Sequence, residues 1–297
     1  MLHVAFHPYP ASMTLEALVA AINEQQGTSF RLGERFGGGE QGAFALVDAA
    51  GTHFVLKRYP AGWTAPFERA RAAIEQLGGR GYPLPRYVAT GTTEGAAYAV
   101  QELLPGEPMG RLDARFIPRL LELNDLQAGS TPFAECYWRP MIVQSVLEGF
   151  DKYCVIATLR DYSPATAELL ARLQGLVRAN ADIELATDDI VHFDFTPANV
   201  LLDEGRISGV IDWDGVCAGD RAFDLVTLLF YAVEQPELRT FLLPEVLART
   251  SEGALQLYLA HLIVRQLDWS IRFHAPEVAT YWLRHTRMLA GELLDLH

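Results

Sequence analysis

The chain has 297 residues, of which 50% are hydrophobic and 21% are charged, an ordinary globular composition that is long enough for two packed lobes. Its formal net charge of −13 argues against a nucleic-acid partner, which needs a basic surface, and is compatible with a cationic small substrate. No apolar run approaches the length that spans a membrane, and three widely spaced cysteines without disulfide or metal spacing indicate a reducing, cytoplasmic setting.

The predicted elements begin with a leader, a helix and three strands. Residues 1–13 lack the basic start and the apolar core of a signal peptide, and we expect a flexible leader there. Residues 14–26 place apolar side chains on one helical face, and Gly27 would end that helix. Residues 30–57 read as three antiparallel strands, with a glycine-rich turn between the first two.

The glycine-rich turn and the end of the third strand are candidates for phosphate binding. The turn contains Gly37, Gly38, Gly39 and Gly42, which allow backbone amides to approach phosphate oxygens closely; a flexible hairpin turn would have the same composition. Lys57 ends an apolar strand, so we expect its stem to be buried and its ammonium to be directed at a partner. A lysine at a strand end can also be a solvated charge, and the residues alone leave both interpretations open.

The character of the chain then changes from β-rich to helical. Residues 63–77 read as a helix that carries Glu68 and Glu75, and residues 98–104 read as an apolar strand followed by a proline-rich turn. After residue 108 the apolar spacing is mostly helical. An aromatic-rich stretch at 133–162 fits either a substrate lid or a core, and core is the commoner role for aromatic side chains at helical spacing.

Residues 190–224 bring together groups that suit phosphate chemistry. Asp194 lies in a polar loop, Asn199 begins a short strand, and Asp212 ends the strand that returns beside it after a turn at 203–206. This hairpin would place Asn199 and Asp212 at one end of the same ribbon. Carboxylate and amide oxygens suit Mg²⁺, and Asp194 could accept a hydrogen bond from an incoming hydroxyl. A polar turn between two buried strands is the alternative.

The motif in this stretch reads His192-x-Asp194-x-x-x-x-Asn199, followed by Ile211-Asp212-Trp213-Asp214. This pattern resembles the catalytic loop and metal-binding strand of the aminoglycoside phosphotransferase/choline kinase family, which is similar to the protein kinases. Phe193 stands where most protein kinases have arginine, and Asp-Trp-Asp replaces Asp-Phe-Gly. Both departures favour a small-molecule kinase.

The resemblance spans almost the whole chain and implies an α+β fold of the two-lobed, protein-kinase-like kind. A small, antiparallel β-rich lobe over residues 1–104 would bind the nucleotide. A larger, mainly helical lobe over residues 105–297 would carry the catalytic and substrate-binding groups.

The resemblance also implies a role for each group of the motif. Asp194 would act as the catalytic base that orients and deprotonates the acceptor hydroxyl. Asn199 and Asp212 would hold Mg²⁺. His192 and Asp224 would support the catalytic loop without taking part in the chemistry.

The nucleotide, ATP or GTP, would bind to the N-terminal lobe. Lys57 would hold its phosphates, with Glu68 as the expected ion-pair partner and Glu75 as the alternative. The four glycines of the turn would cover the phosphates. Backbone groups at the end of the strand over residues 98–104 would bind the adenine edge, around Gln101 and Leu103.

The function implied is nucleotide-dependent phosphorylation of a hydroxyl on a small molecule. An aminoglycoside-like antibiotic is the first choice, which would make the protein a resistance enzyme. The alternatives are a kinase for choline, homoserine, a sugar, a fructosamine or a macrolide, and a catalytically silent nucleotide-binding protein of the same fold. The expected partners are the nucleotide and a small hydroxylated, cationic substrate, with no nucleic acid or membrane, and the chain would act as a monomer or homodimer.

Overall fold

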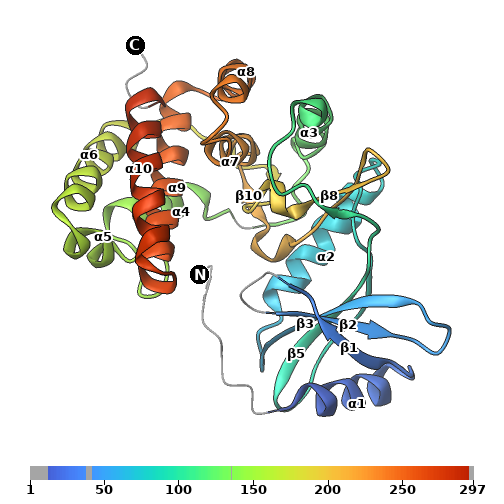
Figure 1. Cartoon of the computed structure of the whole chain (residues 1–297). Coiled ribbons are helices and arrows are strands. Elements are labelled where there is room, and N and C mark those ends of the chain that lie inside the picture. The colour runs from blue at the N-terminus through green and yellow to red at the C-terminus, as the bar shows by residue number, and fades with distance from the viewer. Residues whose placement is uncertain (1–12, 38–41, 135, 294–297) are drawn as a thin grey trace. The chain divides into compact units, whose positions relative to one another are not determined.

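The computed structural model describes residues 13–37, 42–134 and 136–293, and these residues form two compact units (Figure 1). The N-terminal unit consists of the described residues up to Pro108 together with Asn199–Val216. The helical unit consists of Met109–Ala198 together with the described residues from Cys217 onwards. This division differs from the expected boundary after residue 104 in two respects. The first segment of the N-terminal unit extends to Pro108, and the hairpin that follows the predicted catalytic loop also belongs to this unit.

The N-terminal unit is built on a five-stranded antiparallel sheet with the order β1-β2-β3-β5-β4. The three strands predicted between residues 30 and 57 are confirmed and are adjacent members of this sheet. Its members are β1 (Arg31–Arg35), β2 (Ala43–Val47), β3 (His53–Pro60), β4 (Tyr87–Thr92) and β5 (Ala96–Glu102).

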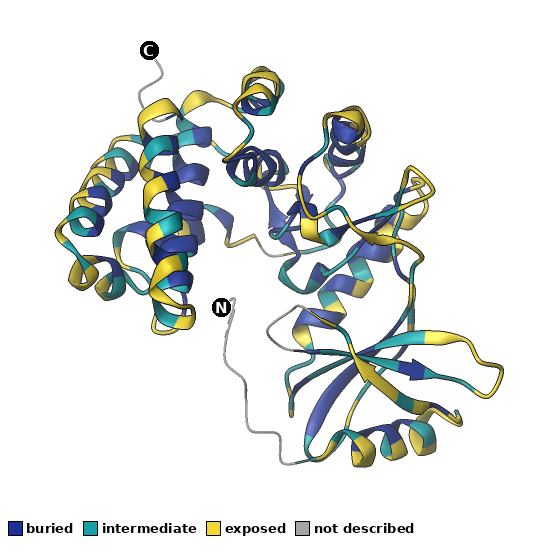
Figure 2. Cartoon of the chain, in the orientation of Figure 1, coloured by how far each residue is buried: buried dark blue, intermediate teal, exposed yellow. Residues whose placement is uncertain are grey.

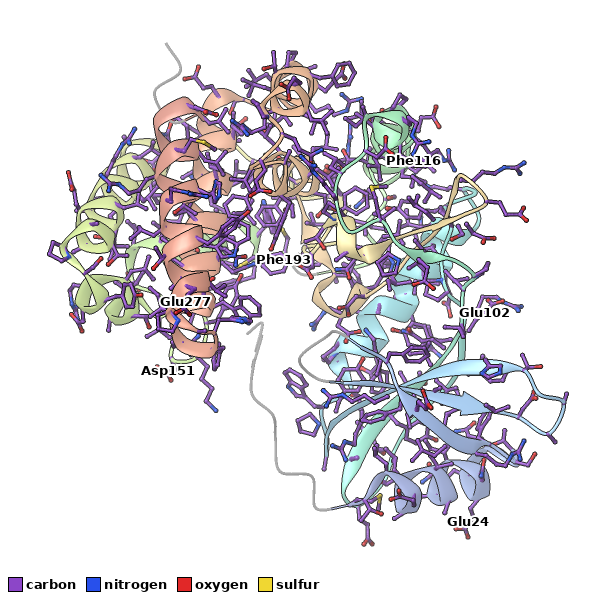
Figure 3. All side chains as sticks on the ribbon, viewed as in Figure 1. Glu24, Glu102, Phe116, Asp151, Phe193 and Glu277 are labelled. Atoms are coloured by element: carbon purple, nitrogen blue, oxygen red, sulfur yellow. The ribbon has the colours of Figure 1, made fainter. Side chains whose placement is uncertain are left out.

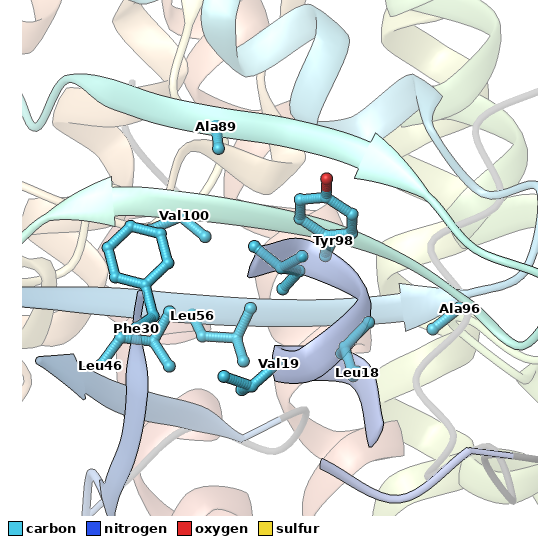
Figure 4. Packing of buried hydrophobic residues seen from close by; sticks show 10 residues of the cluster. Leu18, Val19, Phe30, Leu46, Leu56, Ala89, Ala96, Tyr98 and Val100 are labelled. Atoms are coloured by element: carbon cyan, nitrogen blue, oxygen red, sulfur yellow. The ribbon is translucent and has the colours of Figure 1, made fainter. Parts of the chain in front are cut away.

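Helix α1 (Leu15–Gln26) covers one face of this sheet, is capped at both ends, and ends at Gly27 as predicted. The Thr14 side chain accepts a hydrogen bond from the Ala17 amide at 3.2 Å, and Gly27 ends the helix in the left-handed conformation with φ 64°. The buried apolar side chains of α1 pack against those of the sheet (Figure 4). This contact forms the main hydrophobic core of the unit.

Helix α2 (Ala65–Gly78) contributes Phe67 to a second apolar cluster, whose sheet residues are Tyr59 of β3 and Ala97 and Ala99 of β5. Side chains alternate between the two faces of a strand, so these residues lie on the face opposite to α1. Lys57 is two residues from Tyr59 and therefore shares that face. The register of β3 in the sheet thus decides where the Lys57 side chain points.

The segment after the catalytic loop forms a second sheet with the order β6-β8-β9. Strands β8 (Val200–Asp203) and β9 (Arg206–Val210) make the predicted hairpin, and they pair with β6 (Glu107–Pro108). Both central turn residues have positive φ, 46° at Glu204 and 75° at Gly205, as a two-residue hairpin turn requires. The next short helix, η3 (Trp213–Gly215), packs on α2. These contacts explain why the hairpin belongs to the N-terminal unit.

The helical unit is built around one long buried helix, α9 (Glu252–Phe273). Within the described part of the chain, six helices pack against it: α4 (Trp138–Leu147), α5 (Ile156–Tyr162), α6 (Pro164–Asn180), α7 (Ala222–Tyr231), α8 (Pro236–Leu247) and α10 (Pro276–Leu293). Helix α7 is buried from Ala222 to Phe230 (Figure 2). Two short strands, β7 (Asp189–Val191) and β10 (Cys217–Gly219), pair antiparallel and flank the catalytic segment in sequence. The other elements are η1 (Ala114–Phe116), α3 (Ile117–Leu126) and η2 (Pro197–Asn199), the last of which ends in the N-terminal unit.

The aromatic-rich stretch over residues 133–162 is divided between core and surface. Trp138 and Tyr153 are buried, whereas Tyr137 and Tyr162 are exposed. The core interpretation therefore holds for the two side chains that face inward. Within the described residues, no helix has both the length and the apolar composition needed to cross a membrane.

The main core of the N-terminal unit provides a test of the fold. Leu56 is fully buried in that core, so we expect Leu56→Ala to lower the free energy of unfolding by about 2–5 kcal/mol through lost burial and the cavity left behind. Val88, on the neighbouring strand β4, is 49% exposed, and Val88→Ala should change stability by less than about 0.5 kcal/mol. Urea unfolding followed by circular dichroism measures both, and equal losses would contradict this packing.

Candidate active site

Lys57 lies between two carboxylates of the N-terminal unit. Its Nζ is 2.6 Å from Asp212 Oδ1 and 3.0 Å from Asp214 Oδ1, and its side chain is 15% exposed. Burial disfavours the charged ammonium, but the two carboxylates outweigh this effect, so the pKa of Lys57 is raised above its usual value. The side chain is therefore a permanent cation held at the end of the β8–β9 hairpin.

The hairpin brings Asn199 and Asp212 to the same end of one ribbon, as predicted. Val200 pairs with Val210, and one step further out the Ile211 amide donates a hydrogen bond to the Asn199 carbonyl at 2.9 Å. Asp212 follows directly, with φ 67° in the left-handed region and a side chain that is 46% exposed. Asn199 and Asp212 are thus neighbours across the end of the hairpin, and the Asp212 carboxylate lies beside a fixed cation.

Asp214 is a member of this site that sequence reasoning left without a role. The Tyr59 hydroxyl donates a hydrogen bond to Asp214 Oδ2 at 2.9 Å. Burial raises the pKa of the Asp214 carboxyl; the Lys57 ammonium opposes that shift and the Asp212 carboxylate adds to it, leaving the pKa raised overall. The sequence signal for this contact was a matching spacing, because Tyr59 lies two residues after Lys57 and Asp214 lies two residues after Asp212.

The predicted pairing of Lys57 with Glu68 is wrong for this structure. Glu68 and the alternative, Glu75, are both exposed, and Glu75 lies 3.7 Å from Arg71 on its own helix. Helix α2 buries a face that includes Phe67 and Ile74, and each glutamate follows one of these residues. A step of one residue turns about 100° around a helix, so both carboxylates point away from the buried face.

The other predicted nucleotide-binding residues lie in the N-terminal unit. The Phe36 amide donates to the Ala43 carbonyl at 2.9 Å and closes the turn that contains Gly37 and Gly42; Gly42 has φ 75°. Gly38 and Gly39 lie outside the described residues. At the other end of the sheet, Gln101 is buried and Leu103 is exposed. Their nucleotide roles stay predictions.

The predicted catalytic loop belongs to the helical unit and is held by Asp224 of α7. This fully buried carboxylate accepts hydrogen bonds from the His192 amide at 2.8 Å, the Phe193 amide at 3.0 Å and Gln127 Nε2 at 2.8 Å. Burial raises the pKa of Asp224 to about 7, against the opposing effect of these hydrogen bonds. The His192 ring is also buried, and its Nδ1 accepts from the Asp194 amide at 3.3 Å.

Phe193 has an unusual backbone conformation for a bulky residue, with φ 74°. Its ring is buried in the helical unit (Figure 3) and stacks on Phe223, with centroids 5.3 Å apart and an interplanar angle of 10°. Trp138 meets it edge to face at 6.3 Å. Such a conformation persists only where the surroundings determine it fully, and the Asp224 hydrogen bond and the aromatic contacts do so here.

Asp194, the predicted catalytic base, is bound by an arginine that sequence reasoning missed. Arg265 of α9 places Nη2 at 2.7 Å from Asp194 Oδ1 and Nη1 at 3.1 Å from the Phe193 carbonyl. The Asp194 side chain is nevertheless 41% exposed, so the carboxylate can be approached. The sequence signal for this contact was the position of Arg265, a cation that directly follows an apolar stretch of α9.

The raised pKa of Asp224 predicts how stability depends on pH. The folded protein binds the Asp224 proton more tightly than an unfolded chain does, because the pKa changes from 3.8 to about 7 on folding. This contribution to stability is complete below the lower value and is lost as the pH rises through the upper one. Asp224→Asn removes the titration, so the stability of the wild type relative to the variant should fall between about pH 5 and pH 7, by at most about 1.4 kcal/mol per pH unit. Urea unfolding at several pH values measures this difference, and parallel curves would contradict it.

Comparisons with known proteins agree on the family. The model of the phosphotransferase enzyme family matches residues 33–258. The streptomycin 3''-kinase of Streptomyces griseus is 30% identical over 207 residues, which cover 66% of this chain and 76% of that protein.

Solved structures agree on the fold. The aminoglycoside phosphotransferase APH(4)-Ia, in a ternary complex with ADP and hygromycin B, matches with a TM-score of 0.68 and 21% identity, over 92% of this chain and 97% of that chain. The enzyme APH(3'')-Id from Streptomyces rimosus, in complex with ADP and streptomycin, matches with a TM-score of 0.57 and 19% identity, over 85% and 98%. The α+β, protein-kinase-like fold is thereby confirmed. Because the family match covers most of its length, the chain belongs to the phosphotransferase enzyme family.

Proposed function

We propose that this protein transfers a phosphoryl group from ATP or GTP to a hydroxyl of an aminoglycoside antibiotic. The 30% identity to a streptomycin 3''-kinase supports this acceptor class and makes streptomycin the first compound to test. The net charge of −13 also favours the approach of a polycationic substrate.

One observation carries the phosphotransferase mechanism, namely that Lys57, Asn199 and Asp212 converge at one end of the β8–β9 hairpin. Phosphoryl transfer asks for positioning and for charge neutralisation more than for covalent chemistry. A fixed cation, a carboxylate and an amide in one place meet that need.

The donor set fits a magnesium ion. Asn199 and Asp212 offer hard oxygen ligands at a partly exposed edge, and among the described residues no group of three or more His, Cys, Asp or Glu forms a metal cage. Mg²⁺ is usually held by one or two protein carboxylates together with phosphate oxygens and water. When bound, the ion would neutralise charge on the nucleotide phosphates. Asn199 and Asp212 would hold it.

Lys57 would bind the nucleotide phosphates. Its ammonium is shared by Asp212 and Asp214, so phosphate oxygens would compete with these carboxylates for it. Tyr59 would keep Asp214 in place during that exchange through its 2.9 Å hydrogen bond.

Asp194 would act at the acceptor. The acceptor oxygen forms a bond to phosphorus as the bond between phosphorus and the nucleoside diphosphate breaks. The hydroxyl proton passes to the Asp194 carboxylate. Asp224 and Phe193 would orient the loop for this step, because they determine its backbone.

Substitution of Asp194 tests its assignment as the catalytic base. In a coupled assay of nucleoside diphosphate release with Mg²⁺ and ATP or GTP, the wild type should turn over streptomycin or another aminoglycoside. Asp194→Ala should lower kcat by roughly 10²- to 10⁴-fold and keep nucleotide binding. Asp188 is an exposed aspartate shortly before the loop, and Asp188→Ala should leave turnover unchanged.

The same assay separates the alternatives. Turnover of choline, homoserine, a sugar or a macrolide, with none of any aminoglycoside, would replace the proposed acceptor and keep the kinase mechanism. Unchanged turnover in Asp194→Ala would overturn the assignment of the base. If no acceptor turned over and no nucleotide bound in the presence of Mg²⁺, the catalytically silent alternative would replace the proposal.

Substitution of Lys57 tests its role in binding the nucleotide phosphates. The sequence contains two lysines, Lys57 and the exposed Lys152, which provide a matched pair of variants. Lys57→Met should weaken nucleotide binding roughly tenfold to a hundredfold, because a hydrogen bond to a charged group contributes about 1.5–3 kcal/mol. Lys152→Met should not change it. Calorimetric titration with a nucleotide and Mg²⁺ measures both affinities, and equal affinities for the two variants would count against a phosphate role for Lys57.

A further inference from the structure

Arg265 contacts the catalytic loop at two points. One guanidinium nitrogen lies 2.7 Å from Asp194 Oδ1, and another donates to the Phe193 carbonyl at 3.1 Å. The guanidinium carbon also lies 5.5 Å from the centre of the Phe193 ring. The planar fork of an arginine suits such a double contact because two nitrogens donate in fixed directions, whereas the single nitrogen of a lysine sets no such geometry. Side-chain and backbone positions of the loop are thus held by one group.

The arginine is itself held in place. Its side chain is 14% exposed, and the phenols of Tyr153 and Tyr231 are electrostatic neighbours of its charge. One helical turn earlier on α9, His261 Nδ1 is 2.7 Å from Ser145 Oγ, and its Nε2 is 2.9 Å from the Tyr153 hydroxyl. These buried hydrogen bonds fix the turn of α9 from which Arg265 extends.

We propose that Arg265 is a positioning residue for phosphoryl transfer, which holds the Asp194 carboxylate in the orientation that receives the acceptor proton. This inference rests on the proposed function. With Oδ1 bound to Arg265, rotation of the carboxylate is restricted. A misplacement of about 1 Å at a reacting group can cost about 10²-fold in rate, so the restriction matters for turnover.

The pairing has a particular consequence for a polycationic acceptor. An ammonium group of such a substrate would otherwise form an ion pair with the 41% exposed carboxylate and bind without presenting a hydroxyl to it. Arg265 takes one acceptor position of Oδ1, and its positive charge disfavours an ammonium beside that oxygen. Loss of Arg265 should therefore reduce kcat without weakening substrate binding.

The experiment compares Arg265→Gln with a matched variant on the same helix. Arg272 binds both oxygens of the buried Asp268, each at 2.7 Å, so Arg272→Gln also breaks an arginine–aspartate pair of α9. For Arg265→Gln we expect kcat to fall roughly 30- to 300-fold, with KM for the aminoglycoside unchanged or lower and nucleotide affinity unchanged. Arg272→Gln should keep kcat within about threefold of the wild type, since surface and structural changes away from the reacting groups leave them in place.

A double-mutant cycle distinguishes positioning from a general structural role. If Arg265 acts through Asp194, then Arg265→Gln should cost less than about threefold in an Asp194→Asn background. Arg265→Lys keeps the buried cation and loses the rigid fork of two donating nitrogens, so it should fold well and show an intermediate loss of kcat. If Arg265→Gln does not fold, Arg265→Lys replaces it in the double-mutant cycle.

The outcomes separate the two proposals. If the wild type transfers phosphate and the kcat of both Arg265 variants is retained, or the losses in the cycle are additive, the positioning role is overturned and the proposed function stands. If the wild type transfers phosphate to no acceptor of any class, the kinase mechanism falls and the role of Arg265 falls with it. A kcat loss confined to Arg265 variants and absent from the Asp194→Asn background would support the role.

Discussion

The loop that contains Asp194 depends on one buried carboxylate that binds backbone amides. Asp224 accepts hydrogen bonds from the amides of His192 and Phe193, and these hold Phe193 in a left-handed conformation that a bulky side chain avoids elsewhere. The aromatic contacts of the Phe193 ring then fit only that backbone. Asp194 follows directly, so its direction is a result of the same hydrogen bonds.

Three carboxylates of the sequence motif, those of Asp194, Asp212 and Asp214, have a buried cation as their partner. Lys57 serves Asp212 and Asp214 in the N-terminal unit, and Arg265 serves Asp194 in the helical unit. A buried charge is tolerated when it is paired and hydrogen-bonded. The first group contains two carboxylates for one ammonium, so it keeps an excess of negative charge that a divalent cation can neutralise, whereas the second group is balanced.

The sequence could predict the parts of the site that depend on local structure. The turn at 203–206 and the motif spacing were enough to bring Asn199 and Asp212 together, because a hairpin register follows from a few adjacent residues. The partners of charged side chains were not predictable in this way. Arg265 lies 71 residues after Asp194, and Asp212 lies 155 residues after Lys57. The expected partner, Glu68, is close to Lys57 in sequence, but the helix turns it outward.

The discontinuous make-up of the N-terminal unit has a consequence for how the protein is made. Its five-stranded sheet, α1 and α2 leave the ribosome first. Strand β6 can pair with β8, and α2 can pack on η3, only after residues 199–216 have been synthesised. Helices α3 to α6 are synthesised in between, a delay of roughly 5–20 s at usual elongation rates. During that interval the nascent unit lacks Asn199, Asp212 and the carboxylates that neutralise Lys57. Nucleotide could therefore stabilise the complete unit only late in synthesis, and the surface of α2 that packs on η3 stays uncovered until then.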